Sequence, residues 1–482
     1  MTGLRLRGMT WDHPRGYDPL VACSARYKES TGADIVWDKR SLQDFESFPV
    51  EELAASYDLI VIDHPHAGQV VREGCLHPLD QPGFEAHRRA MLAGSVGLSY
   101  QSYLFGGRLW ALPLDAATQV QAWRPDLLAR APELWDEIAA LARAGKVVLP
   151  LRAPHGLMCV MTLAANLGWQ PGPAGGVFLP SDIGLEVLER LVDLAGHLDR
   201  RCFALDPIGA LDLMGEDDAF SCCPFVYGYV NYAQAGFRPR RLAFADIPTL
   251  GRSGPLGSVL GGTGLAVSAR SRHRETAVDF AYWVTSADIQ RGLYAASGGQ
   301  PGHGAAWLDP AVDMAANGFY SATRATLEGA MVRPRHDGYM AFQDAASRII
   351  VAGLAEGASA SRILGLLNAV DTGRTSSERG IAPPRPPPPP NTRGTLPLSP
   401  RSIFQPRKLT NQSRRSGVRI GNPSVVECSL VARPPVGPAL DPRPKPATPG
   451  TKPAGTAARP SSSARCSDRI RWPRSAPHLS AR

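Results

Sequence analysis

The sequence lacks the features that mark several large functional classes. It contains no apolar run of about 18 residues, which a membrane-spanning helix requires. It contains no G-x-x-x-x-G-K-[S/T] P-loop and no G-x-S-x-G nucleophile motif, so neither an ATPase site nor a serine-hydrolase site is indicated. The stretch Gly261–Gly264 is rich in glycine but does not complete a dinucleotide-binding fingerprint.

Cysteine is also scarce, with eight residues among 482. No two cysteines have C-x-x-C spacing, and no cysteine and histidine group has zinc-finger spacing. This pattern excludes a disulfide framework and a structural zinc site of that kind. The adjacent Cys222 and Cys223 suit neither a mutual disulfide nor a metal site, and we interpret them as small buried apolar residues.

Acidic residues are nearly absent from the end of the chain. Residues 381–482 hold 18 of the 52 basic side chains, three of the 44 acidic ones and 22 of the 44 prolines. The net charge of +8 therefore comes from this tail, because residues 1–380 keep 34 basic and 41 acidic side chains. An acidic body, and a tail with few aromatics for base stacking, argue against a nucleic-acid binder.

The tail, taken as 376–482, holds too little apolar surface to offset chain entropy and is predicted to be disordered. Its proline run is compatible with an extended docking segment, and its charge with a basic arm for anionic partners. We favour a third interpretation, a non-native extension of the chain, because compositional signals alone are weak.

The first 65 residues alternate strand and helix signals. Strands are predicted at 4–9, 34–37 and 59–62, and helices at about 17–30 and 51–56. The continuous apolar run Leu59–Ile62 is typical of a parallel strand covered on both faces. This order indicates the start of an open α/β sheet.

The later chain predicts a second α/β lobe. It carries a strand signal at 147–151 and helix signals at 132–143, 155–167 and from Ser181 onward. Further helices are predicted at 275–285 and 287–296, and two more close the body at 338–356 and 359–369.

Polar residues follow two of the predicted parallel strands, at 11–16 and at 63–66. Ligands of open parallel sheets bind beyond the carboxyl ends of the strands, so both clusters are expected to border one cleft. Taken singly, Asp12 and Asp63 could simply cap helices. Zinc is another alternative, if the cluster's nitrogen and oxygen donors converge: Asp12, His13, Asp63, His64 and His66.

The order and spacing of four segments resemble the family 1 extracellular solute-binding proteins of ABC importers, the sugar-binding group that includes maltose-binding protein. The resemblance spans about 4–372 and is carried by 112–115 with 123–128, 260–267, 296–301 and 332–335. It implies a two-lobed periplasmic-binding-protein fold of type II, with two open α/β sheets joined by a hinge. The implied lobes are 1–112 with 262–310 and 113–261 with 311–375. The chain would cross between them at 111–117 and 259–262.

The resemblance also implies a function. A monomer would capture a small polar ligand, a sugar or sugar derivative, by hinge closure and deliver it to the membrane subunits of an ABC transporter, without a catalytic residue, cofactor or metal. Such proteins work in the periplasm or otherwise outside the cytoplasmic membrane. Residues 1–7 lack the apolar region of a signal peptide, so either the signal lies upstream of Met1 or the protein stays inside. The alternative function is an enzyme on the same scaffold, with Asp63 and His64 as acid and base.

The ligand-binding residues implied for a polyol supply flat aromatic faces and planar polar groups. The faces are assigned to Trp11, Tyr227, Tyr229 and Tyr232, each of which core packing would explain equally well. Thr263 stands where the family often has an aromatic residue, which puts stacking there in doubt. The polar groups and the glycines that let backbone approach the ligand are Asp12, His13, Asp63, His64, Arg152, His155, Gln300, Arg335, Gly261 and Gly262.

Overall fold

The computed structural model describes residues 4–172, 177–251 and 254–378. Contacts between residues divide the chain into one unit at 1–387 and another at 388–482, and the second lies wholly outside the described residues. The predicted tail therefore lies outside them as well, except that 376–378 end helix α17 (Ala360–Glu378).

The first sheet is built mainly from the amino-terminal part of the chain, with the strand order β2-β1-β3-β11-β4 and with β7 paired to β11. β1 runs parallel to β2 and β3, with Leu6 opposite Ile35 and Gly8 opposite Leu59, whereas β11 runs antiparallel to its neighbours. The strands are β1 (Arg5–Trp11), β2 (Asp34–Arg40), β3 (Leu59–Ile62), β4 (Leu76–His77), β7 (Leu112–Asp115) and β11 (Thr263–Ser268).

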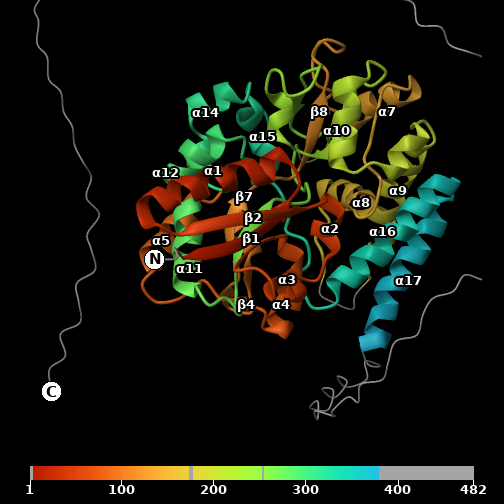
Figure 1. Ribbon diagram of the computed structural model, residues 1–482. Coiled ribbons are helices and arrows are strands. Elements are labelled where there is room, and N and C mark those ends of the chain that lie inside the picture. Colours follow the sequence, from red (N-terminus) through yellow and green to blue (C-terminus); the bar gives the residue numbers. More distant parts are fainter. Residues whose placement is uncertain (1–3, 173–176, 252–253, 379–482) are drawn as a thin grey trace, which may run out of the picture. The chain divides into compact units, whose positions relative to one another are not determined.

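Helices cover this sheet as the sequence predicts. Helix α1 (Pro14–Thr31) packs against β2 and lies beside β1 and β2 in Figure 1, and α11 (Arg274–Val284) packs against β11. All four residues of β3 are buried, as expected for a strand covered on both faces.

Local capping sets the ends of α1. The His13 ring accepts the Arg15 amide hydrogen at 3.0 Å, and Pro14 occupies the first turn, so the helix begins three residues before the predicted Tyr17. It ends at Gly32, whose φ of 77° is readily adopted only by glycine.

A short helix that the sequence did not predict, α2 (Leu42–Ser47), follows β2 and is capped by the Ser41 hydroxyl. Other elements of this region are α3 (Val50–Ala54), η1 (His64–His66), α4 (Ala67–Glu73), α5 (Glu85–Gly94), α6 (Ser99–Ser102), β5 (Leu104–Phe105), β6 (Arg108–Leu109), α12 (Ala287–Ile289) and the π-helix η4 (Gln290–Tyr294).

The second sheet has the order β10-β8-β9, all antiparallel, and is surrounded by helices. Every residue of α8 (His155–Asn166) is buried. Figure 1 shows α16 and α17 running along α8 and α9. The strands and helices are β8 (Gln119–Trp123), β9 (Cys222–Tyr227), β10 (Ala243–Ala245), α7 (Trp135–Arg143), α9 (Ser181–Ala195), η2 (Arg200–Ala204), α10 (Pro207–Glu216), η3 (Val230–Ala233), α13 (Gly304–Trp307), α14 (Pro310–Ala315), α15 (Phe319–Glu328) and α16 (Tyr339–Glu356).

The segment 147–151 does not form the predicted strand, because its backbone changes partners along its length. The Val148 amide donates to the Cys222 carbonyl, whereas the Leu151 amide donates to Cys202 on η2. Cys222 and Cys223 are fully buried, which confirms their interpretation as packing residues.

Two separate clusters of buried apolar side chains give the fold two lobes. One cluster draws on 6–114 and 265–294, and the other on 116–260 and 307–367 together with Val96. Crossing segments between them lie side by side, because Asp115 bridges to Pro301, Thr118 to Leu260 and Val259 to Met331. The crossing positions at 111–117 and 259–262 and the lobe bounds that they imply stay predictions.

Among the residues that the structure describes, none of the helices combines the length and apolar character needed to cross a membrane.

Candidate ligand-binding cleft

A cavity of about 60 Å³ lies where the two cores meet the crossing segments. A water molecule needs roughly 10–15 Å³ measured in this way, so the cavity holds only a few waters as it stands. The residues that line it are Trp11, Arg15, Leu42, Phe45, Glu46, Asp63, Ala117, Pro154, Met158, Pro207, Tyr227, Tyr229, Gly261, Gly262, Thr263 and Arg333.

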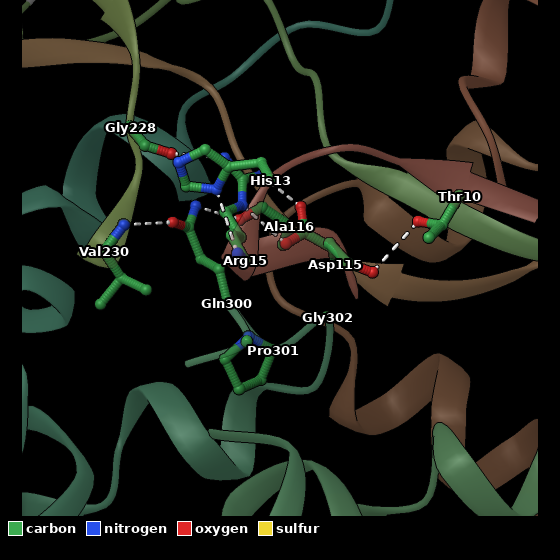
Figure 2. Close-up of polar contacts among 12 residues, drawn as sticks. Thr10, His13, Arg15, Asp115, Ala116, Gly228, Val230, Gln300, Pro301 and Gly302 are labelled. Carbon is green, nitrogen blue, oxygen red and sulfur yellow. Dashed lines mark hydrogen bonds and ion pairs between the residues drawn. The ribbon is translucent and has the colours of Figure 1, made fainter. Parts of the chain in front are cut away.

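Arg15 joins three parts of the chain at this cavity (Figure 2). Its guanidinium donates to both carboxylate oxygens of Asp115 at the end of β7, with the Nε–Oδ2 distance at 2.8 Å. It also donates to the Gly228 carbonyl beyond β9 at 2.7 Å, and the Tyr229 ring lies 4.3 Å away. Burial opposes its charge, but Asp115 outweighs burial and raises the pKa of Arg15.

Arg333 forms the second buried ion pair. It donates to Asp63, just after β3, at 2.5 Å and to Gln343 on α16 at 3.2 Å. Burial disfavours the Asp63 charge, but Arg333 outweighs it and holds the pKa of Asp63 below its usual range. Nε of Arg333 is buried and has no hydrogen-bond partner.

Glu46 on α2 is the acidic residue of the cavity without an ion-pair partner of its own. Its side chain is 25% exposed, and Nε2 of His155 lies 3.9 Å from its carboxylate. Burial lowers the pKa of His155 to about 3, so that ring is neutral. Burial, and then the nearby Asp63 charge, raise the pKa of Glu46 to about 8.

Aromatic rings form much of the remaining wall. The Trp11 and Phe45 rings lie 5.5 Å apart, and Tyr227 and Tyr229 face them from the other lobe. A Cβ on Gly261 would lie 2.5 Å from Tyr227 Cε1, so only glycine lets the second crossing approach this ring. The neighbouring Gly262 has a φ of 81°.

Several buried polar atoms of the lining have no hydrogen-bond partner. Native proteins rarely leave buried polar groups unpaired, so a cluster of them at a cavity indicates that something else satisfies them. The cluster consists of Trp11 Nε1, Tyr227 Oη, Thr263 Oγ1 and Arg333 Nε, and both nitrogens of the nearby His155 are also unpaired.

Comparison with known proteins agrees with this geometry. No family model and no curated protein matches the chain. Solved structures do match: the maltose-bound MalE3 of T. maritima aligns with 77% of this chain and 100% of its own, at a TM-score of 0.66 and 18% identity. An ABC transporter solute-binding protein from Agrobacterium radiobacter in complex with ribitol covers 77% of this chain and 99% of its own, at a TM-score of 0.63 and 18% identity. The GacH receptor of Streptomyces glaucescens covers 78% and 98%, at a TM-score of 0.64 and 14% identity.

This chain has the fold of an ABC-transporter solute-binding protein.

Six of the fourteen predicted site residues line the cleft of this solute-binding fold. They come from the ends of β1, β3 and β9 and from the second crossing: Trp11, Asp63, Tyr227, Tyr229, Gly261 and Gly262. The structure therefore brings together the two strand-end clusters and the aromatic segment of the other lobe.

Of the strand-end cluster, Asp12 and His13 do not line the cleft. Asp12 is exposed and forms an ion pair with Lys39 at 2.6 Å. His13 caps α1 and packs its ring edge-on against Tyr229, 4.6 Å between centroids. The turn that starts α1 points Arg15 into the cleft instead, one helical turn beyond Asp12.

His64 and Arg152 lie beside the cleft rather than in its wall. His64 is fully buried behind Asp63, with Nδ1 3.2 Å from that carboxylate. Burial and Arg333 lower the pKa of His64 to about 4. Arg152 is 41% exposed and lies 3.8 Å from Asp206, which precedes α10.

The side chains of Gln300 and Arg335 form hydrogen bonds with backbone groups and do not line the cleft. Gln300 is buried, donates to the Ala116 carbonyl at 2.7 Å and accepts the Val230 amide hydrogen at 3.0 Å (Figure 2). Arg335 donates to three carbonyls, those of Gln101, Ser102 and Leu104.

Of the lining residues that sequence analysis did not assign, Arg15, Glu46 and Arg333 have ionisable side chains. Arg15 lies within the polar stretch at 11–16, and Arg333 within the 332–335 segment that carried the resemblance, so both had a signal nearby. Glu46 had none. In the described part of the chain, no group of three or more His, Cys, Asp or Glu side chains could hold a metal ion.

Proposed function

We propose that the chain is the solute-binding component of an ABC importer and that it captures a sugar or polyol in the cleft between its lobes. The observation that carries this proposal is the cluster of unpartnered buried polar atoms among aromatic faces in one cavity. Hydroxyl groups of a polyol would pair with these atoms, and its C–H faces would lie on the rings.

The solved neighbours support this choice of ligand. They were determined with maltose, ribitol and D-mannitol, and each aligns with this chain over nearly its own full length. A chain with this fold and with a polar, aromatic cleft between its two cores is well suited to bind such a ligand.

Lobes at 1–112 with 262–310 and at 113–261 with 311–375 would rotate about the crossing segments. The hydrogen bond from Arg15 to Gly228 and the ion pair of Arg333 with Asp63 join opposite lobes and would form on closure. Because the cavity holds only a few waters, entry of a sugar requires these contacts to open. Binding would then shift the population toward the closed form that membrane subunits recognise.

The same proposal makes the protein a monomer that works outside the cytoplasmic membrane, with transporter subunits as its partner and no chemical conversion of the ligand. The mechanism needs no cofactor, because hydrogen bonds and ring faces supply all the recognition.

Calorimetric titration with maltose, ribitol and D-mannitol tests the proposal. We expect one molecule bound per chain and recovered intact. Tyr227→Phe removes a hydroxyl that has no protein partner, so it should leave the melting temperature unchanged and weaken binding about tenfold, the loss of one hydrogen bond to ligand.

Tyr294→Phe is the matched control, since its buried hydroxyl is also unpartnered but does not line the cavity. Trp11→Ala should weaken binding further, and Trp283→Ala, outside the cleft, should not. Equal affinity in Tyr227→Phe and wild type would remove this cavity from the ligand site, and conversion of the ligand would end the transport proposal.

A further inference from the structure

The charges around the cleft are matched in pairs with one exception. Arg15 is paired with Asp115, Arg333 with Asp63, and Arg152 lies nearest to Asp206. Glu46 remains as an acidic group without a cation of its own.

The Glu46 carboxylate makes no hydrogen bond to another described residue. The titratable and charged groups around it are His155 on α8, His66 beside the Glu46 backbone, Asp63 and Arg333 at the cleft wall, and Arg152 with Asp206 before α10. Arg333 and Arg152 form ion pairs with Asp63 and Asp206, and His155 is neutral and 3.9 Å away. The most favourable missing partner of a half-buried carboxylate is a cation that donates hydrogen bonds.

The walls beside Glu46 suit a small organic cation. Phe45 precedes Glu46 on α2, and the Trp11, Tyr227 and Tyr229 rings complete a lining of four aromatics around one cavity. An ammonium group within about 6 Å of a ring face is attracted by the ring quadrupole, and more strongly where water is excluded. The paired Arg15 and Arg333 present no uncompensated positive charge to oppose it.

We infer that the ligand of this cleft carries a protonated amino group, which Glu46 binds, so that the substrate class is an amino sugar or an amine-bearing polyol. This inference rests on the proposed function and narrows it. The hydroxyl groups of such a ligand would use Tyr227, Thr263 and Trp11, and its ammonium group would use Glu46 and the rings.

Glu46 would change its protonation state on binding. In the empty cleft its pKa of about 8 keeps it protonated at pH 7. An ammonium group beside it stabilises the carboxylate, so binding releases about one proton from Glu46 to solvent while the amine keeps its own. A neutral sugar would instead accept a hydrogen bond from protonated Glu46 and release none.

Matched ligands test this on the full chain. D-glucosamine is compared with D-glucose, and D-glucamine with D-glucitol, by calorimetry at pH 7 in two buffers of different ionisation enthalpy. We expect the amine of each pair to bind at least tenfold more tightly and to release about one proton. Glu46→Gln should abolish both differences, and Glu52→Gln, an exposed acid on α3, should keep them.

The outcomes separate this inference from the proposed function. Equal binding of amine and neutral members, without proton release, overturns the amino-group inference and leaves sugar capture intact. Binding of neither member of either pair, nor of maltose, ribitol or D-mannitol, overturns both. Because proton release is measured on the unaltered protein, the test does not depend on Glu46→Gln folding normally.

Discussion

Asp115→Asn should destabilise the protein strongly, although it only replaces one carboxylate oxygen by an amide group. Asp115 is fully buried, and the Arg15 side chain paired with it is only 3% exposed. The substitution removes the charge that compensates a guanidinium which cannot lose its proton. Arg15 would keep two uncharged acceptors, the Gly228 carbonyl at 2.7 Å and the amide oxygen that replaces the carboxylate.

Removing one partner of a buried ion pair costs about 3–5 kcal/mol, because the remaining charge stays out of water. That is a large part of the roughly 5–15 kcal/mol that separates folded from unfolded states in typical domains. We therefore expect Asp115→Asn to lower the denaturation midpoint markedly. Equilibrium unfolding in urea, followed by tryptophan fluorescence, measures the effect, and Trp11 lies close to the site, 5.8 Å from the Arg15 guanidinium.

The matched control is Asp34→Asn, which breaks an exposed pair with Lys28 and should lower the denaturation midpoint far less. Adding Arg15→Met to Asp115→Asn should restore part of the loss, since no buried charge then remains. A loss in Asp115→Asn as small as that of the control would refute the reasoning, because it would mean that water or another group already compensates Arg15.

Two further substitutions test other parts of the cleft. The folded protein holds a proton on Glu46 up to about pH 8, whereas the unfolded chain loses it near its ordinary pKa of 4.5. The free energy of unfolding of the ligand-free protein should therefore fall as pH rises between these values, by an amount on the order of 5 kcal/mol. Glu46→Gln should remove this fall when the melting temperature is measured as a function of pH. An unchanged slope would mean that other groups cause the fall. Gln300→Leu should cost about 2–5 kcal/mol, because it leaves the buried Ala116 carbonyl and Val230 amide unpaired. Chemical denaturation measures this loss. The control is Gln69→Leu on the partly exposed α4, for which we expect a loss of less than about 1 kcal/mol. Equal losses in the two variants would contradict the bridging role of Gln300.

The fold was predictable where periodicity was strong. The apolar run Leu59–Ile62 and the alternating segments before it predicted the parallel strands, and the polar residues after them predicted a cleft at the strand ends. The strand predicted at 147–151 failed, because its pairing depends on Cys222 and Cys202, which lie far along the chain. Local patterns carry no information about such partners.

The site was predictable to the level of segments but not of individual side chains. Trp11 and Arg15 line the cleft whereas Asp12 points to solvent, a choice made by the turn at the start of α1. The partner of Arg15 lies 100 residues away, which no spacing rule reaches. Glu46 lies on a six-residue helix with one buried side chain, too short to show a period, and glutamate is usually exposed.

The bridges that tie the crossing segments to one another would restrict how the two lobes move if the proposed closure operates. Because Thr118 is joined to Leu260 and Val259 to Met331, the segments would bend together, and relative motion would reduce to rotation about a common axis. Ala117, Gly261 and Gly262, on or beside these segments, would then change position little, whereas Glu46 and Met158 on opposite lobes would approach each other as the angle closes. Under this proposal a ligand would meet a stationary floor of backbone first, and its charge would be met last.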